Sequence, residues 1–255
     1  MKIVIIGAGN VGTQLGRAFR EKDFPVVQVY SRTLSSAETL GKKLQTNYTN
    51  QLQQITPNAD IYVFSVKDAA LPELLKTFPA VGGLWVHTAG SVPMDIFKES
   101  AATRYGVFYP LQTFSKNRDV SFEHIPIFTE ANHPSDQQLL DQIARSLSNR
   151  VIPLSSEKRK YLHLAAVFAC NFTNHLYDIA AQILENQAID WNVLLPLIEE
   201  TADKVQELSP REAQTGPAMR YDLPVIEKHL EMLKNDPEKQ EIYRMLSRSI
   251  HRHCE

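Results

Sequence analysis

Cysteine is scarce in this sequence, and so are clusters of metal ligands. Only Cys170 and Cys254 occur among the 255 residues, which is too few for the disulfide framework of a small secreted scaffold. We therefore expect a reducing, cytoplasmic setting. His, Cys and acidic residues do not gather at the spacing of a metal site, so no metal cofactor is expected.

Long apolar runs and a strong net charge are also missing. The apolar run Ile3–Ile6 is too short for the core of a signal peptide, and no other run approaches transmembrane length. The formal net charge is -2, which gives no general attraction to nucleic acid or to an anionic membrane. We expect neither as a partner, and any anionic ligand needs a local binding site.

A glycine-rich turn stands at the start of the chain. Lys2–Ile6 has the β-branched, apolar composition of a strand buried on both faces of a parallel sheet. The next residues have the spacing G-x-G-x-x-G and lead into an apolar helical pattern, which is typical of a turn that cradles the pyrophosphate of a dinucleotide. The alternative is an ordinary glycine-rich turn between a strand and a helix. The residues expected to contact the cofactor here are Gly7, Gly9, Asn10, Val11 and Gly12.

The next expected strand, Pro25–Tyr30, bears on which dinucleotide binds. NAD-selective sites place Asp or Glu at the end of this strand to accept the ribose hydroxyls. This chain has Ser31, Arg32 and Thr33 there instead, and a guanidinium can bind a 2′-phosphate that a carboxylate would repel. The sequence therefore predicts NADP. In the alternative interpretation, Ser31 caps a helix over 34–43 and Arg32 is a solvated surface charge.

Strand and helix patterns alternate through the first part of the chain. This alternation predicts a Rossmann-type, doubly wound α/β domain over residues 1–154 with seven or eight strands. The further expected strands are Thr46–Thr49, Asp60–Val66, Leu84–His87, one beginning at Gly106, Ile125–Thr129 and Arg150–Leu154; the expected helices, after the first, are 34–43, 69–78 and 135–148.

Several polar residues follow the expected strands at their carboxyl ends, where such sheets bind ligands. Ser65, Val66 and Lys67 are expected near the cofactor, although position alone gives them no catalytic role. His87 is expected beside the nicotinamide, with a structural histidine as the alternative. The Gln112 amide can orient a polar substrate or equally satisfy the backbone of its own loop.

Strand patterns stop near Ser155, and residues 155–255 are expected to form an all-helical domain. The longest helical pattern runs from about Ser156 to Gln187. At 1.5 Å per residue such a helix spans on the order of 45 Å, so it is expected to cross between domains or into a partner subunit. Further helices are expected over Trp191–Leu208, Asp222–Lys234 and Pro237–Arg252.

One face of the expected long helix is polar. At about 100° per residue, His163, Asn171, Asn174 and Asp178 lie within about 80° of one another. Buried polar groups must find partners, so these side chains either bind a ligand or bond across a helix interface.

The chain resembles a bacterial family in which a Rossmann-like NADP-binding domain precedes a helical domain of unknown function, and whose members are described as NADP oxidoreductases. The architecture is similar to that of β-hydroxyacid dehydrogenases, pyrroline-5-carboxylate reductases and deazaflavin-dependent NADP reductases. The chain differs in two ways: no lysine lies between His163 and Asn171, and Tyr109 stands where the family tends to have histidine. The resemblance is carried by Gly7–Gly12, Ser31-Arg32, His87–Gly90, Pro110–Phe114, His163–Val167 with Asn171, and Thr215–Pro217 with Arg220 and Asp222.

This resemblance implies hydride transfer between NADP(H) and a small polar carbonyl, imine or hydroxy acid in a cleft between domains, often completed by homodimerisation through the helical part. A substrate that gains hydride needs a proton donor. The catalytic candidates are His163 as donor, Asn171 as an orienting group and Gln112 as a further substrate contact. Two alternatives remain: a non-catalytic NADP-binding sensor or homodimeric assembly module, and a structural protein that binds no nucleotide.

Overall fold

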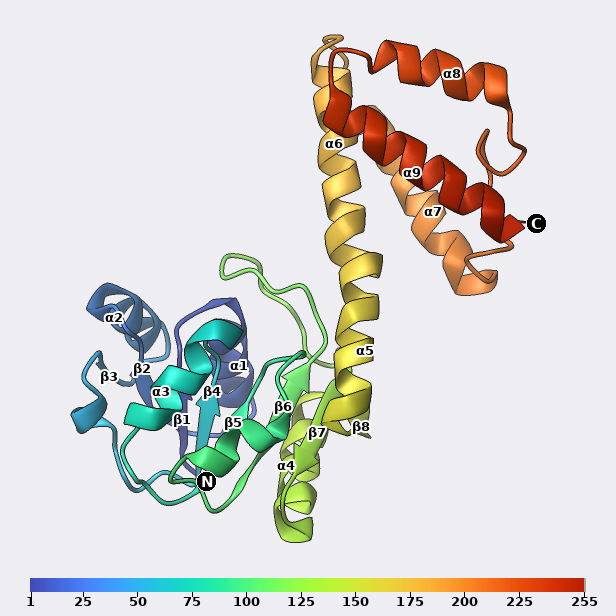
Figure 1. Cartoon of the computed structure of the whole chain (residues 1–255). Coiled ribbons are helices and arrows are strands. Elements are labelled where there is room, and N and C mark those ends of the chain that lie inside the picture. The colour runs from blue at the N-terminus through green and yellow to red at the C-terminus, as the bar shows by residue number, and fades with distance from the viewer. Residues whose placement is uncertain (255) are drawn as a thin grey trace. The chain divides into compact units, whose positions relative to one another are not determined.

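The computed structural model describes residues 1–254, and its contacts divide the chain into two compact units. The first unit is Met1–Cys170 and the second begins at Asn171. The division therefore falls inside the long helix rather than at residue 154, where the change of sequence pattern suggested it. The first unit contains the sheet shown in Figure 1.

Eight strands form one sheet in the order β3-β2-β1-β4-β5-β6-β7-β8. Neighbouring strands are parallel except β6 and β7, which are antiparallel. No helix lies between these two strands among the described residues, and parallel pairing would require a long crossover connection. The strands are β1 (Ile3–Ile6), β2 (Val26–Tyr30), β3 (Asn47–Thr49), β4 (Ile61–Phe64), β5 (Leu84–His87), β6 (Tyr105–Pro110), β7 (Ile127–Ala131) and β8 (Val151–Pro153).

Helices cover both faces of this sheet, which explains why its strands read as continuous apolar runs. In β1, Ile3 and Ile5 pack in one apolar cluster, and Val4 and Ile6 pack in another on the opposite face. The expected Rossmann-type fold is therefore confirmed. The helices that pack on the sheet are α1 (Asn10–Glu21), α2 (Leu34–Lys43), α3 (Leu71–Thr77), α4 (Pro134–Leu147) and α5 (Ser156–Ala166).

The long helix is continuous but not uniform. Between α5 and α6 (Thr173–Glu185) lies a π-helical turn, Val167–Phe172. Its i→i+5 hydrogen bonds place more residues in each turn than an α-helix does. The assumption of 100° per residue, which grouped His163 with Asn171, is therefore wrong across this turn.

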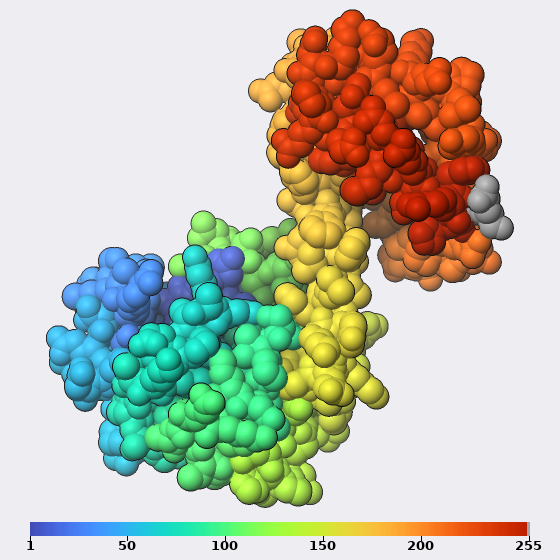
Figure 2. Space-filling model, in the orientation of Figure 1, coloured from blue at the N-terminus to red at the C-terminus, as the bar shows by residue number. Residues whose placement is uncertain are grey.

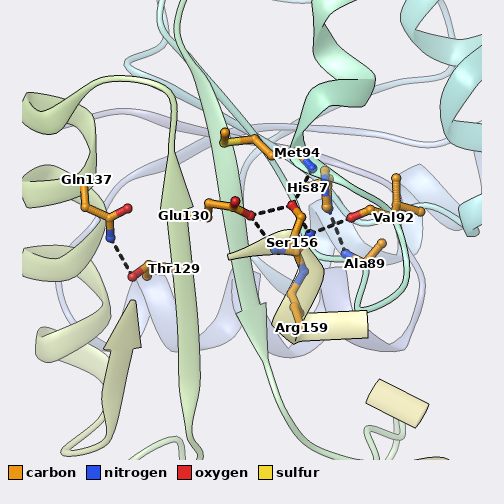
Figure 3. A network of polar contacts seen from close by, with 9 residues as sticks. All are labelled: His87, Ala89, Val92, Met94, Thr129, Glu130, Gln137, Ser156 and Arg159. Atoms are coloured by element: carbon orange, nitrogen blue, oxygen red, sulfur yellow. Dashed lines mark hydrogen bonds and ion pairs between the residues drawn. The ribbon is translucent and has the colours of Figure 1, made fainter. Parts of the chain in front are cut away.

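The start of α5 belongs to the first unit because a buried ion pair attaches it to the sheet (Figure 3). Arg159 is 1% exposed, and its Nη1 donates to Glu130 Oε2 on β7 at 2.7 Å. Its Nη2 donates to the Val92 carbonyl at 2.6 Å, and the Ser156 hydroxyl also donates to Glu130. This network explains why the division of the chain falls beyond α5.

The second unit consists of helices with few buried side chains. Its elements after α6 are a 3₁₀ turn (Trp191–Leu194), α7 (Leu195–Glu207), α8 (Leu223–Met232) and α9 (Pro237–Cys254), which form the orange and red surface in Figure 2. Among its described side chains, only Ala218, Ile226 and Ser247 are buried. Within residues 1–254, no helix combines the length and apolarity needed to cross a membrane.

Candidate cofactor and active site

The glycine turn between β1 and α1 is built so closely that two of its glycines have no room for a side chain. Gly7 has φ +111°, and a Cβ there would lie 2.4 Å from the Ser65 carbonyl oxygen. A Cβ on Gly12 would lie 2.1 Å from the Gly7 oxygen. Gly9 is different, since its nearest neighbour would be 3.8 Å away. Gly7 and Gly12 thus allow the turn to form, while Gly9 leaves open space beside the first turn of α1.

A cavity of about 580 Å³ lies beside this turn, at the carboxyl ends of β1, β2 and β4. In Figure 2 it lies between the blue surface of α2 and the teal surface of α3. Its walls also include Leu52 and Leu74. No local sequence pattern marks these two residues, because only the tertiary fold brings their apolar side chains to the turn. The expected cofactor residues that line it are Gly7, Gly9, Ser31, Arg32, Thr33, Ser65, Val66 and Lys67.

The Ser65 hydroxyl is a buried polar group without a partner in the described part of the chain. The residue is 8% exposed, lines the cavity, and its Oγ makes no hydrogen bond. A buried hydroxyl left without a partner is costly. A polar ligand in the cavity would remove this cost, so the donor set fits a bound nucleotide.

The segment after β2 places a cation at the cavity, whose lining also includes Glu73. Arg32 is exposed and lines the cavity. The N-cap residue of α2 is Thr33, whose side chain makes no capping hydrogen bond; its hydroxyl donates to Ser36 Oγ at 2.8 Å. The alternative in which Ser31 caps this helix is therefore wrong, and the Ser31 N–H instead donates to the Thr49 carbonyl at 3.2 Å.

Asn10 and Val11 form the first turn of α1 rather than part of the cavity wall. Asn10 is exposed, and Val11 packs partly against the apolar core. Their side chains are not among those that line the cavity. What Asn10 and Val11 can offer a cofactor is therefore the backbone N–H groups at the start of the helix.

His87 differs from the expectation of a cofactor contact. Its ring is fully buried, stacks on Phe97 at 5.7 Å between ring centroids, and accepts a hydrogen bond from the Ala89 N–H at 3.2 Å. Burial, together with the positive charge of Arg159, lowers the pKa of His87 to about 3. The ring points into the packed face of the sheet and does not line the cavity. The structural alternative accounts for this residue.

His163 does have a polar partner in the first unit. The Tyr109 hydroxyl lies 3.0 Å from His163 Nδ1, and a Cβ on Gly90 would lie 2.5 Å from the same nitrogen. The ring is half-buried. Tyr109 was noted in the sequence only as a departure from the family pattern, and its contact with His163 gives that departure a structural role.

The other two catalytic candidates are placed differently. The Gln112 side chain is exposed, and its Oε1 accepts a hydrogen bond from the N–H of Thr113 at 2.8 Å. The alternative in which this amide satisfies its own loop therefore describes the structure. Asn171 is exposed within the π-helical turn and is the first residue of the second unit.

Comparison with protein families places the chain. Residues 1–111 match a Rossmann-like domain, and residues 125–250 match a domain of unknown function, DUF2520. A solved structure from Bacteroides fragilis, described as a putative NADP oxidoreductase, is 52% identical, covers 98% of both chains and has a TM-score of 0.93. The chain belongs to this NADP oxidoreductase family. No curated protein matches the sequence.

Two more distant structures share the fold of this chain. A 1-pyrroline-5-carboxylate reductase from Streptococcus pyogenes is 13% identical, with a TM-score of 0.68 and 98% of each chain covered. A reductive aminase from Aspergillus terreus, solved with NADPH and ethyl-5-oxohexanoate, is 15% identical, with a TM-score of 0.74, covering 98% of this chain and 92% of the other. At these identities the likeness shows the fold alone.

Proposed function

We propose that the protein is an NADP-dependent oxidoreductase that reduces a small polar carbonyl or imine, or oxidises the corresponding alcohol or amine. The observation that carries this proposal is the cavity in which the glycine turn, the unpartnered Ser65 hydroxyl and the Arg32 guanidinium meet. The turn would hold the pyrophosphate. Arg32 and Thr33 would hold the 2′-phosphate, since a guanidinium forms paired, charge-assisted hydrogen bonds with phosphate oxygens.

When bound, NADPH supplies a hydride to the carbon of the C=O or C=N group. The substrate oxygen or nitrogen then needs a proton, and His163 is the candidate donor, afterwards reprotonated from solvent. Asn171 and Gln112 stay predictions as orienting groups. Because Gln112 is bonded to Thr113, it would have to give up that hydrogen bond to reach a substrate.

The binding experiment compares NADPH with NADH. Arg32→Ala should raise the Kd for NADPH roughly tenfold or more, because a hydrogen bond to a charged group contributes about 1.5–3 kcal/mol, and should leave the Kd for NADH within about twofold. Arg20→Ala on the exposed surface of α1 is the matched control and should change neither value. Calorimetric titration measures both, and equal weakening of the two cofactors would contradict the assignment of Arg32.

The activity experiment follows NADPH oxidation with a panel of small ketones, 2-oxo acids and cyclic imines. We expect turnover of at least one class, and we expect His163→Ala to reduce that turnover about 100-fold or more, within the range of a general acid. Stoichiometric NADPH binding without oxidation of any compound would favour the sensor alternative instead. A His163→Ala rate within a few-fold of wild type would remove His163 from the donor role.

We also propose that the protein is a homodimer assembled through its second unit. The support is the large apolar side chains that this unit exposes, with few buried ones to form a core of its own. Exposed apolar surface of this extent is typical of an interface. The occupant we commit to is a second copy of the same chain.

A further inference from the structure

We propose that Tyr109 is a positioning residue that, together with Gly90, holds the His163 ring by its Nδ1 edge and so leaves Nε2 as the nitrogen through which His163 would reach the substrate. This inference rests on the proposed role of His163 as proton donor. It goes beyond that role because it states which ring nitrogen is used and what holds it.

The Tyr109 hydroxyl contacts one edge of the imidazole. Its oxygen lies 3.0 Å from Nδ1, and the two rings meet edge to face at 72° with 6.2 Å between centroids. The hydroxyl can donate to Nδ1 of the neutral ring, which then has its hydrogen on Nε2, and it can accept from the Nδ1–H of the protonated ring. Tyr109 therefore occupies Nδ1 in both states. Nε2 lies on the opposite edge of the ring, away from Tyr109.

The surroundings of Tyr109 hold its ring in place. Its ring is 8% exposed and packs with Val107 and Phe128 on the face of the sheet where α5 docks. Burial raises the pKa of Tyr109 to about 12, with a smaller lowering effect from Arg159 and a raising effect from Asp68. The hydroxyl therefore keeps its hydrogen throughout the neutral range and can both donate to and accept from His163.

The backbone of Gly90 also packs against the His163 ring. The backbone of this residue packs so closely on His163 that an added Cβ would lie 2.5 Å from Nδ1 and 2.7 Å from Cγ. Real Cβ atoms do not approach ring atoms this closely, so an alanine would have to displace the ring. Gly90 does not have a positive φ, so the constraint is one of space rather than of backbone conformation.

A continuous path of contacts links this arrangement to the cofactor cavity. Lys67 lines the cavity, and the next residue, Asp68, accepts a hydrogen bond from the Ser91 hydroxyl. Ser91 follows Gly90 directly in the loop after β5. The His163 ring is thus packed on the loop that also joins the cavity wall, within the first unit.

The experiment reads the ring directly, with no substrate. In protein labelled with ¹⁵N-histidine, the His163 signals are those that disappear in His163→Asn. At alkaline pH, with the Tyr109 hydroxyl still protonated, we expect the neutral His163 ring of wild-type protein to carry its hydrogen on Nε2 and to accept a hydrogen bond at Nδ1. Tyr109→Phe should move both nitrogen shifts toward the averaged values of a histidine that exchanges between tautomers.

Tyr105→Phe is the matched control, because Tyr105 lies on the same strand but packs in the other cluster, beside Phe97. It should leave the His163 shifts unchanged. If Tyr109→Phe proves unfolded by its amide spectrum, Gly90→Ala replaces it and should shift the same two nitrogens. A hydrogen on Nδ1 of the neutral ring in wild-type protein, or His163 shifts that Tyr109→Phe leaves unchanged, overturns the inference.

Activity separates this inference from the proposed function. With a compound that the panel shows to be reduced, Tyr109→Phe should lower kcat about tenfold or more and leave the Kd for NADPH unchanged. An altered tautomer with unchanged kcat overturns the positioning role. A His163→Ala variant with normal turnover overturns the donor role of His163 instead, and the ¹⁵N shifts still report whether Tyr109 holds the ring.

Discussion

At the scale of single residues, His87 shows how a position at a strand end can mislead. The sequence places it where a nicotinamide would lie in this fold, and the structure buries it completely beside Phe97. Alternation along β5 decides the outcome, because Trp85 and His87 point to the same covered face. Its lowered pKa makes it a neutral core residue at working pH rather than an acid.

This burial predicts a pH-dependent stability. Unfolded His87 takes up a proton below its ordinary pKa of about 6.5, whereas the folded residue stays neutral down to about pH 3. The unfolded state then binds more protons, so the free energy of unfolding should fall as the pH drops from 6.5 toward 3, by up to about 1.4 kcal/mol per pH unit from this group.

Urea unfolding between pH 4.5 and 7.5 measures that slope. The matched variant is His87→Gln, which cannot titrate and should show a correspondingly shallower dependence on pH, even if it is less stable overall. Identical slopes for the two proteins would mean that His87 takes up its proton as readily in the folded state.

Arg32, in contrast, is a site residue that the sequence alone predicts. Its importance follows from local spacing, since the end of the second strand lies a fixed distance beyond the glycine turn, and the residue does line the cavity. Tyr109 could not be found in this way. Its partner, His163, lies 54 residues further along the chain, and no local pattern joins them.

At the scale of elements, the glycine turn and most strands follow from the sequence, but the order of the strands in the sheet and the π-helical turn do not. Apolar periodicity marks β1, α1 and most of the sheet because each strand and helix has its own repeat. One extra residue in a helical turn leaves composition and approximate periodicity intact. The faces of the long helix beyond Val167 were therefore misassigned, although its extent was close to correct.

Gly9 and Gly12 of the turn should respond differently to alanine. Gly12→Ala forces a Cβ to within 2.1 Å of the Gly7 carbonyl oxygen, and such overpacking costs typically about 1–3 kcal/mol. Gly9→Ala has space for its Cβ but places it at the cavity wall. We expect Gly12→Ala to lower the Tm and Gly9→Ala to keep the Tm while weakening NADPH binding.

Thermal unfolding and NADPH titration on the same samples separate the two effects. Equal losses of stability in Gly9→Ala and Gly12→Ala would contradict the different roles we assign. Normal NADPH binding by Gly9→Ala would show that the cofactor does not approach this residue.

The ion pair that attaches α5 to the sheet should contribute strongly to stability. Arg159→Met leaves the Glu130 carboxylate, 19% exposed, without its cation, and breaking a buried pair typically costs about 3–5 kcal/mol. The double variant Arg159→Met/Glu130→Gln should lose less than the sum of the two single variants, because the unpaired charge is gone. Urea unfolding gives all four free energies.

Lys98→Met is the control for this cycle. Lys98 and Asp95 form an ion pair of similar length, 2.7 Å, but both side chains are more than half exposed. Solvent screening limits such pairs to roughly 0–1 kcal/mol. Comparable losses in Lys98→Met and Arg159→Met would show that burial does not strengthen the Arg159 contact.

At the scale of the whole molecule, the sequence pattern changes from strands to helices near Ser155, but the boundary between the two compact units lies after Cys170. The first turns of α5 are helical in pattern and belong by contact to the sheet unit, because Arg159 and Leu162 pack there. Charge pairing and packing across distant segments decide this division. The periodicity of the sequence does not predict these long-range contacts.

The second unit supplies the last prediction, which concerns assembly. Leu197 on α7 is 62% exposed, and a charge at this position would be buried in the proposed homodimer interface at a large desolvation cost. Leu197→Arg should therefore shift the protein from dimer to monomer in sedimentation velocity at micromolar concentration. Leu34→Arg makes the same substitution at a half-exposed leucine of the first unit and should leave the dimer intact; a wild-type chain that sediments as a monomer would refute the homodimer outright.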